Sequence, residues 1–223
     1  MIGNVLHPRI IENKEWATAL FVISFATIAL TKSVFENRFA DFTNLIFSDK
    51  YNKVYRDSIH LKSGFTISLF FVQIISLAFF IQLSMAHLGY ASKTDWVLYI
   101  QIITFLVFFI LSKFLIEKII ASAFNMEEFV EQFNLQKVTY RTYIGIFILP
   151  INVILFYYES IPRNILLILI GIVLITNILT YLVSIKNYQK LIFSKLFYFI
   201  LYLCALEIAP YYFIYYWFTK GIA

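Results

Sequence analysis

Charged residues are scarce in this sequence: Asp, Glu, Lys and Arg make up 14% of the 223 residues, against about 25% in a typical soluble domain. Hydrophobic residues make up 61%, and aromatic residues 20%. So few charges cannot cover a water-exposed surface, so most apolar side chains must face lipid or other helices. The composition excludes an ordinary soluble domain and predicts an all-α, polytopic membrane bundle.

Signatures of catalysis and of cofactor binding are also lacking. The sequence contains no Walker loop, dinucleotide fingerprint or nucleophile elbow. His7, His60 and His87 lie in separate segments without a second ligand at helical spacing, and the single Cys204 cannot form an internal disulfide. We therefore expect no metal and no cofactor. The net charge of +5 indicates membrane topology and anionic lipids rather than nucleic acid.

Long apolar runs are what the sequence has in abundance. A hydrocarbon core about 30 Å thick needs about 20 apolar residues per helical span. We predict one integral membrane domain over residues 1–223, with about six transmembrane helices and one or two amphipathic interfacial helices. The predicted spans cover about 16–31, 64–87, 96–118, 143–158, 165–185 and 196–218. The first and fourth are short, so either could be re-entrant instead.

One amphipathic helix is predicted in the connection after the first span. Phe35, Phe39, Phe42 and Ile46 are spaced by four, three and four residues, which places them on one helical face. This face is interpreted either as a helix lying in the headgroup layer or as a partner-binding helix.

A second long connection is predicted over residues 116–142. It contains Glu127, Glu128 and Glu131. Such an acidic cluster could receive a cation, although a solvated helix face explains it more simply.

Basic residues are unevenly divided between the two sides of a six-span protein. Thirteen of the 18 Lys and Arg residues fall on the side of the long connections. The positive-inside rule then predicts that these connections are cytoplasmic and both termini periplasmic. Trp16, Trp96 and Trp217 would all lie at the opposite face, at the interfacial level that Trp prefers.

Glu207 is the most informative candidate residue. It lies about 16 Å into the last predicted span, where a carboxyl group must be paired, protonated or hydrated. Pro210 follows closely and should kink the helix. Lys113, in the third span, is the natural partner for Glu207, although Glu117 competes for it one turn away. The pair is interpreted either as an ion or proton site or as a device that locks helix packing.

The stretch Leu201–Pro210, Leu-Tyr-Leu-Cys-Ala-Leu-Glu-Ile-Ala-Pro, resembles the closing signature of domain-of-unknown-function family 4271. This is an uncharacterised multi-pass membrane family of Bacteroidota. The similarity in hydropathy extends over nearly the whole chain. It implies a small inner-membrane protein in which Lys113, Glu207 and Pro210 match family motif positions, and it implies no particular activity.

Two functions from different classes stay open. The absence of catalytic signatures and the basic cytoplasmic connections favour a non-enzymatic inner-membrane scaffold or accessory subunit of an envelope, secretion or motility complex. Such a subunit would contact membrane lipids and a membrane-protein partner or further copies of itself. The alternative is a small proton- or ion-coupled transporter centred on Glu207 and the Pro210 kink. A membrane-embedded lipid enzyme using the acidic cluster is a third interpretation.

Overall fold

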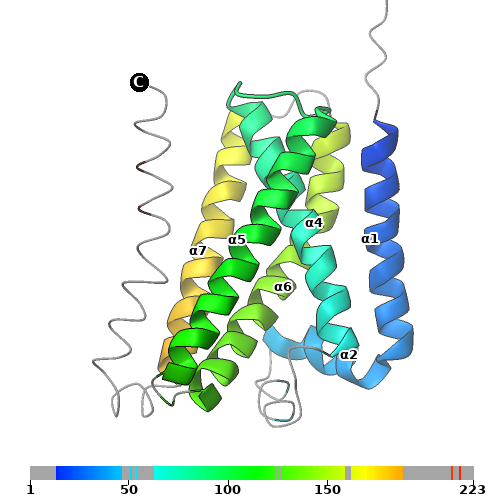
Figure 1. Cartoon of the computed structure of the whole chain (residues 1–223). Helices are drawn as coiled ribbons and strands as arrows, with labels where there is room; N and C mark the ends of the chain where they lie inside the picture. Colours follow the sequence, from blue (N-terminus) through cyan, green and yellow to red (C-terminus); the bar gives the residue numbers. More distant parts are fainter. Residues whose placement is uncertain are drawn as a thin grey trace, which may run out of the picture.

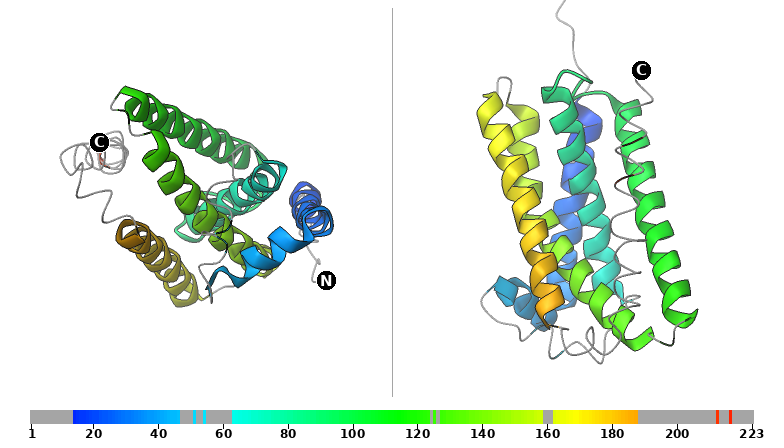
Figure 2. Two further views of the ribbon diagram at one scale, coloured as in Figure 1. Left: turned by 90° about the horizontal axis from the view of Figure 1, so that it is seen from below. Right: turned by 90° about the vertical axis from the view of Figure 1, so that its left-hand side faces the viewer.

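The computed structural model describes residues 14–46, 51, 54, 63–123, 125, 127–158, 162–187, 212 and 216. In these ranges the regular structure is helical, without strands. The helices form a bundle in which successive long helices run in opposite directions (Figure 1, Figure 2). Five are long and apolar enough to cross a membrane: α1 (Glu15–Val34), α4 (Gly64–His87), α5 (Trp96–Ala123), α6 (Glu127–Tyr157) and α7 (Arg163–Asn187). The predicted helical membrane bundle is confirmed.

Five of the six predicted spans coincide with these helices, and the sixth, 196–218, lies outside the described residues. The bounds of α4 agree with the prediction residue for residue. The helices over the first and fourth predicted spans are both long enough to cross a membrane, since α1 has 20 residues and α6 has 31. The prediction of a connection over 116–142 is wrong. There, α5 continues to Ala123 and α6 already begins at Glu127.

The turn between α5 and α6 is short because both helices continue beyond their apolar residues into the charged segment between them. Neither Gly nor Pro occurs between Glu127 and Ile144, so nothing local breaks α6 there. The turn centres on Asn125, whose φ is 51°, a left-handed conformation that Asn adopts more readily than most residues. Pro150 lies inside α6; the helix continues through it with one backbone donor fewer.

The ends of α4 explain why its bounds could be predicted. Ser63 caps its first turn, with the side-chain oxygen accepting a hydrogen bond from the Thr66 N–H. At the other end Gly89 has a φ of 85°. Gly89 and Tyr90 donate to the carbonyls of Ala86 and Met85, which is a Schellman motif.

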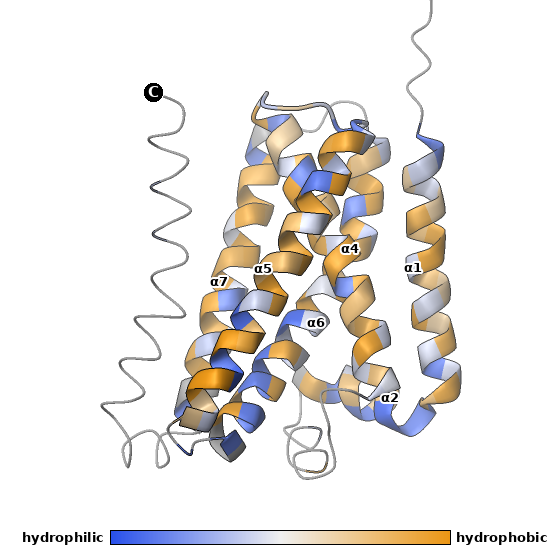
Figure 3. Ribbon diagram, viewed as in Figure 1, coloured by the Kyte–Doolittle hydropathy of each residue, from blue (hydrophilic) through white to orange (hydrophobic). Residues whose placement is uncertain are grey.

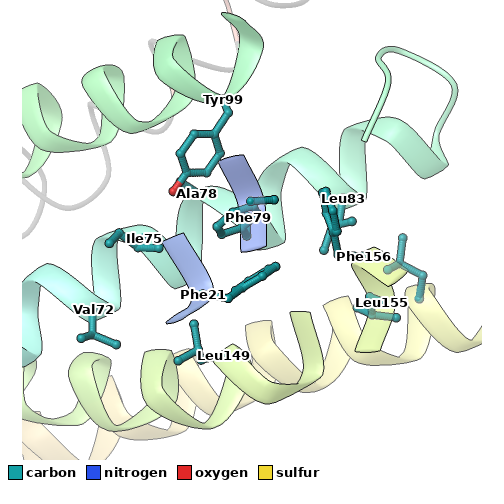
Figure 4. Packing of buried hydrophobic residues seen from close by; sticks show 12 residues of the cluster. Phe21, Val72, Ile75, Ala78, Phe79, Leu83, Tyr99, Leu149, Leu155 and Phe156 are labelled. Atoms are coloured by element: carbon teal, nitrogen blue, oxygen red, sulfur yellow. The ribbon is translucent and has the colours of Figure 1, made fainter. Parts of the chain in front are cut away.

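We call the end at which α1 begins the upper end, as drawn in Figure 1, and the end at which α5 joins α6 the lower end. The larger hydrophobic cluster joins α1, α4, α5, α6 and the start of α7 toward the upper end (Figure 4). Phe79 of α4 is its centre, with ring centroids 4.3 Å from Phe21 and 4.6 Å from Tyr99. Trp16 and Trp96 meet edge-on at 5.1 Å, which confirms that these two Trp residues share one end; Trp217 lies outside the described residues.

A second cluster lies at the lower end, where a short helix follows α1. This helix, α2 (Glu36–Thr43), leads into the 3₁₀ turn η1 (Asn44–Ile46). Phe42 is buried, and its ring centroid lies 5.8 Å from that of Phe65 in α4 and 5.5 Å from that of Tyr143 in α6. The helix α2 is therefore fastened to the bundle by its apolar face.

Candidate functional site

A buried ion pair joins α5 to α6 in the lower part of the bundle. The Lys137 Nζ donates to Glu117 Oε1 over 3.3 Å, and the two side chains are 6% and 5% exposed. The ammonium also lies 5.0 Å from the centre of the Phe133 ring. The Phe133 ring in turn contacts Tyr181 of α7. The pair is thus enclosed by three helices.

The depth of this pair follows from the helical rise. Glu117 lies about 31 Å along α5 from Trp96, and Lys137 about 30 Å along α6 from Tyr157, at 1.5 Å per residue. Both distances equal the thickness of a hydrocarbon core of about 30 Å. The ion pair therefore sits where the lower boundary of the membrane should fall, and Figure 3 shows hydrophilic residues gathered on the lower parts of α5 and α6.

Burial makes the ion pair costly to disrupt. Removing two charges from water costs several kcal/mol per ion, and their mutual attraction offsets this only when both partners are present. The pair also draws together two helices that share few other buried contacts, because among the residues of α5 only Tyr99, Glu117 and Ala121 are buried. The pair therefore fixes the register of α5 against α6.

A second set of buried polar groups lies along the seam between α4 and α6. The Thr142 hydroxyl donates to Gln73 Oε1 over 2.8 Å. Further up, ten residues along α6 and three along α4, the Asn152 amide donates to the Ser76 carbonyl over 2.7 Å. All four residues are buried. Since residue numbers rise in the same direction on both helices, α4 and α6 run in the same direction through the bundle.

Close approach of the backbones makes the seam possible. A Cβ on Gly145 would lie 2.9 Å from Gln73 Cγ and 3.1 Å from Gln73 Cα, so only glycine fits at this crossing. Small residues at helix crossings and amide or hydroxyl groups across them are how transmembrane helices pack. Gln73 and Asn152 therefore make hydrogen bonds between helices. The Asn177 amide, in contrast, donates to the carbonyl of Val173 within α7.

At the upper end, hydrogen bonds to main-chain groups join the ends of α4, α5 and α6. The Gln82 amide, at the end of α4, donates to the carbonyl of Asp95 over 2.8 Å. The Asp95 carboxylate accepts hydrogen bonds from the N–H groups of Val97 and Leu98 and so caps α5. Lys93, in the same loop, donates to the carbonyl of Tyr158. The start of α5 and the end of α6 are therefore held at the same height in the bundle.

At the lower end, Arg38 of α2 makes the hydrogen bonds that join α2 to α4. Its guanidinium donates to Ser63 Oγ over 3.1 Å, and at 3.4 Å to Thr66 Oγ1 and to the Tyr51 hydroxyl. It also covers the Phe65 ring at 4.5 Å. Arg38 therefore ties α2 to the first turn of α4 by hydrogen bonds and a cation–π contact.

The predicted site residues have different outcomes. Glu207 and Pro210 lie outside the described residues, so pairing of Lys113 with Glu207 stays a prediction. Lys113 is half-buried on α5, one turn before Glu117. Glu117 itself pairs with Lys137, a residue that the sequence assigned to a connection.

The apolar face of α2 also differs from its prediction. Phe42 is buried within its own chain, and Phe35 and Phe39 pack partly buried against the same cluster. The ring of Phe35 meets that of Phe65 edge-on. Ile46 ends η1, and its side chain is not among those described. An interface role for this face stays a prediction, but Phe42 is already occupied by intramolecular packing.

Sequence reasoning missed the Glu117–Lys137 pair because it treated 116–142 as a loop. One signal was available. In a helical hairpin that turns near Asn125, residues equally far from the turn face each other. Glu117 would then lie opposite Phe133, and Lys137 is one helical turn beyond Phe133. Within the described ranges, no group of three or more His, Cys, Asp or Glu side chains gathers in a metal-binding arrangement.

These features define a class: an α-helical membrane protein whose helices are packed by aromatic rings, buried amides and a buried ion pair. Over residues 17–218 the chain matches a family described as a domain of unknown function, DUF4271. The chain belongs to this family, which confirms the resemblance noted in the sequence. No curated protein and no solved structure matches it.

Proposed function

We propose that the chain is a non-enzymatic inner-membrane scaffold or accessory subunit, and that its docking element is the hairpin tip. We define the hairpin tip as residues 117–137, the lower part of α5 and α6 with the turn between them. Partners would be membrane lipids around the bundle and a protein in the cytoplasm at the tip.

The length of α5 and α6 carries this proposal. With 28 and 31 residues, they are about 42 and 46 Å long, whereas a hydrocarbon core is about 30 Å thick. Their upper ends are held level by the contact of Lys93 with Tyr158 and by Trp16, whose ring contacts both Trp96 of α5 and Phe156 of α6. The surplus of about 12 to 16 Å therefore belongs to the lower end.

The chemistry of the hairpin tip supports docking in an aqueous compartment. Lys118, Glu127 and Glu131 are exposed, so charges of both signs stand on a short rigid support. The buried ion pair at the base of the tip restrains α5 against α6. The positive-inside rule favours the cytoplasm for this end, with the start of α1 in the periplasm.

A site-specific cross-linking experiment tests the proposal. A photo-reactive amino acid is placed at Glu131 in the full chain, and the cross-links are formed in the native membrane. The matched control is Tyr90, which is 77% exposed in the loop at the upper end. We expect one discrete protein adduct from position 131, in stoichiometric yield, and none from position 90.

An intact, membrane-inserted protein that yields no adduct from position 131 would overturn the scaffold proposal. Equal adducts from positions 131 and 90 would also contradict it, because they would indicate unspecific collision. Charge reversal at Glu127 and Glu131 together should reduce the adduct at a neighbouring position by about tenfold if charge pairing is worth about 1.4 kcal/mol.

A second candidate function is favoured by the buried polar groups. The Glu117–Lys137 pair and the Gln73–Thr142 contact place ionisable and polar side chains inside the bundle. Intramembrane ionisable groups commonly mark ion or proton pathways. Together with Glu207 and Pro210, they support a small proton- or ion-coupled transporter as the alternative.

Proteoliposomes distinguish the two functions. The transporter predicts a proton or cation flux that Glu207→Gln abolishes and that a Glu117→Gln/Lys137→Gln double substitution reduces, while the protein stays folded. The scaffold predicts no flux from the purified chain and an unchanged adduct at position 131 in the Glu207→Gln variant. Absence of flux from correctly inserted wild-type protein would eliminate the transporter.

A further inference from the structure

One face of α5 is exposed along almost the whole membrane-spanning length of the helix. Only 6% of the residues in its most apolar stretch are buried, the same share as in α7, against 56% in α4. Side chains spaced by three and four residues lie on one face of a helix. The exposed residues at this spacing are Val97, Gln101, Thr104, Phe105, Phe108, Leu111 and Leu115. We call these seven residues the α5 stripe.

Two members of the α5 stripe are polar and lie within the apolar span. Gln101 and Thr104 are about 7.5 and 12 Å along the helix from Trp96, so both fall inside the hydrocarbon layer. Neither side chain makes a hydrogen bond to another residue in the part of the chain that the structure describes. An amide and a hydroxyl facing lipid without a partner cost free energy.

Other hydroxyls in the same bundle avoid this cost. Those of Thr27, Thr31 and Thr176 each donate to a carbonyl one turn earlier in their own helix. Thr104 does not do so, and the Gln101 amide is left open at the neighbouring position. The α5 stripe thus combines a broad apolar face with two open polar groups, which is the pattern of a helix–helix contact in a membrane.

We propose that the α5 stripe binds the α5 stripe of a second copy of this chain. A carboxamide carries a donor and an acceptor, so two Gln101 side chains can exchange reciprocal hydrogen bonds across a two-fold axis. Two copies inserted in the same orientation bring Gln101 to the same depth without further adjustment. Phe105 and Phe108, which is 71% exposed, extend the contact toward the lower end.

This pairing does not depend on the function of the hairpin tip. Both helices of an α5 pair leave the membrane side by side, so a dimer would present two hairpin tips. The pairing can nevertheless be present in a protein that transports ions, and the tip can bind a partner from a monomer. The experiments on the two proposals therefore fail separately.

Disulfide formation between copies tests the proposal in the native membrane. Cys204 is replaced by Ser, and Val97→Cys introduces a thiol on the α5 stripe one turn before the intact Gln101. The control is Ile165→Cys, equally near the upper end and half exposed on α7. Oxidation should convert most of the Val97→Cys protein to a dimer and leave the Ile165→Cys protein monomeric.

Adding Gln101→Leu to the Val97→Cys chain separates the polar contact from chance proximity. Leu inserts into the bilayer at least as well as Gln, so the variant should be equally abundant. Loss of the two reciprocal hydrogen bonds should weaken association by a factor of about eight, which is about 1.2 kcal/mol at the average of about 0.6 kcal/mol for each such contact in membranes. Energy transfer between labelled copies in vesicles, diluted with lipid, measures this shift.

Three results would overturn the pairing. One is a monomeric Val97→Cys protein after oxidation, with wild-type abundance in the membrane. Another is equal dimer formation at positions 97 and 165. The third is unchanged association after Gln101→Leu, which would leave the polar groups without a role and would point to a lipid-facing surface or to cover by the segment after Asn187.

Discussion

The two ends of the bundle are closed by different chemistry. At the upper end, rings from α1, α5 and α6 surround Phe79 of α4. At the lower end, the contacts that join elements include an ion pair, the Arg38 hydrogen bonds and one aromatic cluster. Lipid is as apolar as a ring, so rings stabilise helix association only through close packing. Polar groups inside a membrane stabilise it strongly only when each meets a hydrogen-bonding or charged partner. At the upper end, ring packing is joined by hydrogen bonds of Gln82 and Lys93 to main-chain carbonyls next to the helix ends. At the lower end, pairs of side chains specify which residues must meet.

The largest effect is expected at the ion pair. Lys137→Ala should leave the Glu117 carboxylate buried without this partner and destabilise the folded protein by about 3–5 kcal/mol. A neutral Glu117→Gln/Lys137→Met double variant should come within about 1 kcal/mol of wild type, because neither side chain is then left charged. Unfolding in mild detergent measures both. A double variant as unstable as the single one would show that packing, rather than charge pairing, joins α5 to α6.

A somewhat smaller effect is expected at the upper end. Phe79 is fully buried, and Phe79→Ala should cost about 2–3 kcal/mol through the cavity it leaves; the transfer term of a soluble core is largely absent in lipid. Phe25 of α1, which is 44% exposed, provides the matched control, and Phe25→Ala should change stability by less than about 0.5 kcal/mol. If the two substitutions had equal effects, the aromatic cluster would contribute no specific packing.

The crossing of α4 and α6 can be tested with two glycines. Gly145→Ala places a methyl group against Gln73 and should destabilise by about 1–3 kcal/mol, despite the gain in helix propensity. Gly171→Ala meets nothing within 4 Å and should stabilise α7 by up to about 1 kcal/mol. Thermal unfolding of the two variants should therefore shift in opposite directions. A shift in the same direction would contradict the close approach at Gly145.

The sequence was sufficient where local signals set the structure. The bounds of α4 were predictable because an uncharged apolar run lies between a capping Ser63 and the turn at Gly89. The shared face of Phe35, Phe39 and Phe42 was predictable from spacing. The surface against which this face packs was not predictable, because the rings that it contacts belong to α4 and α6, far along the chain.

The lower part of α6 shows the limit most clearly. Its charged residues lower the hydropathy, so the predicted span began only at residue 143. In the folded chain, Lys137 is neutralised by a residue of another helix and Glu131 projects outward. A hydropathy average cannot distinguish a helix with one paired and one outward-facing charge from a loop, since the distinction depends on which helix lies opposite. The partners along the polar seam between α4 and α6 could not be predicted for the same reason, because a hydrogen-bond partner depends on how the helices pack.

The smallest effect we predict concerns that seam. Thr142→Val keeps the shape of the side chain but removes the hydroxyl that donates to Gln73, and it should cost about 0.6 kcal/mol, the average for such contacts in membranes. Thr27→Val is the control, because the Thr27 hydroxyl bonds only within α1 and its loss should be close to neutral. A double-mutant cycle with Gln73→Leu isolates the pair, and a coupling near zero would mean that Gly145, through close backbone contact, positions α4 against α6 without help from the hydrogen bond.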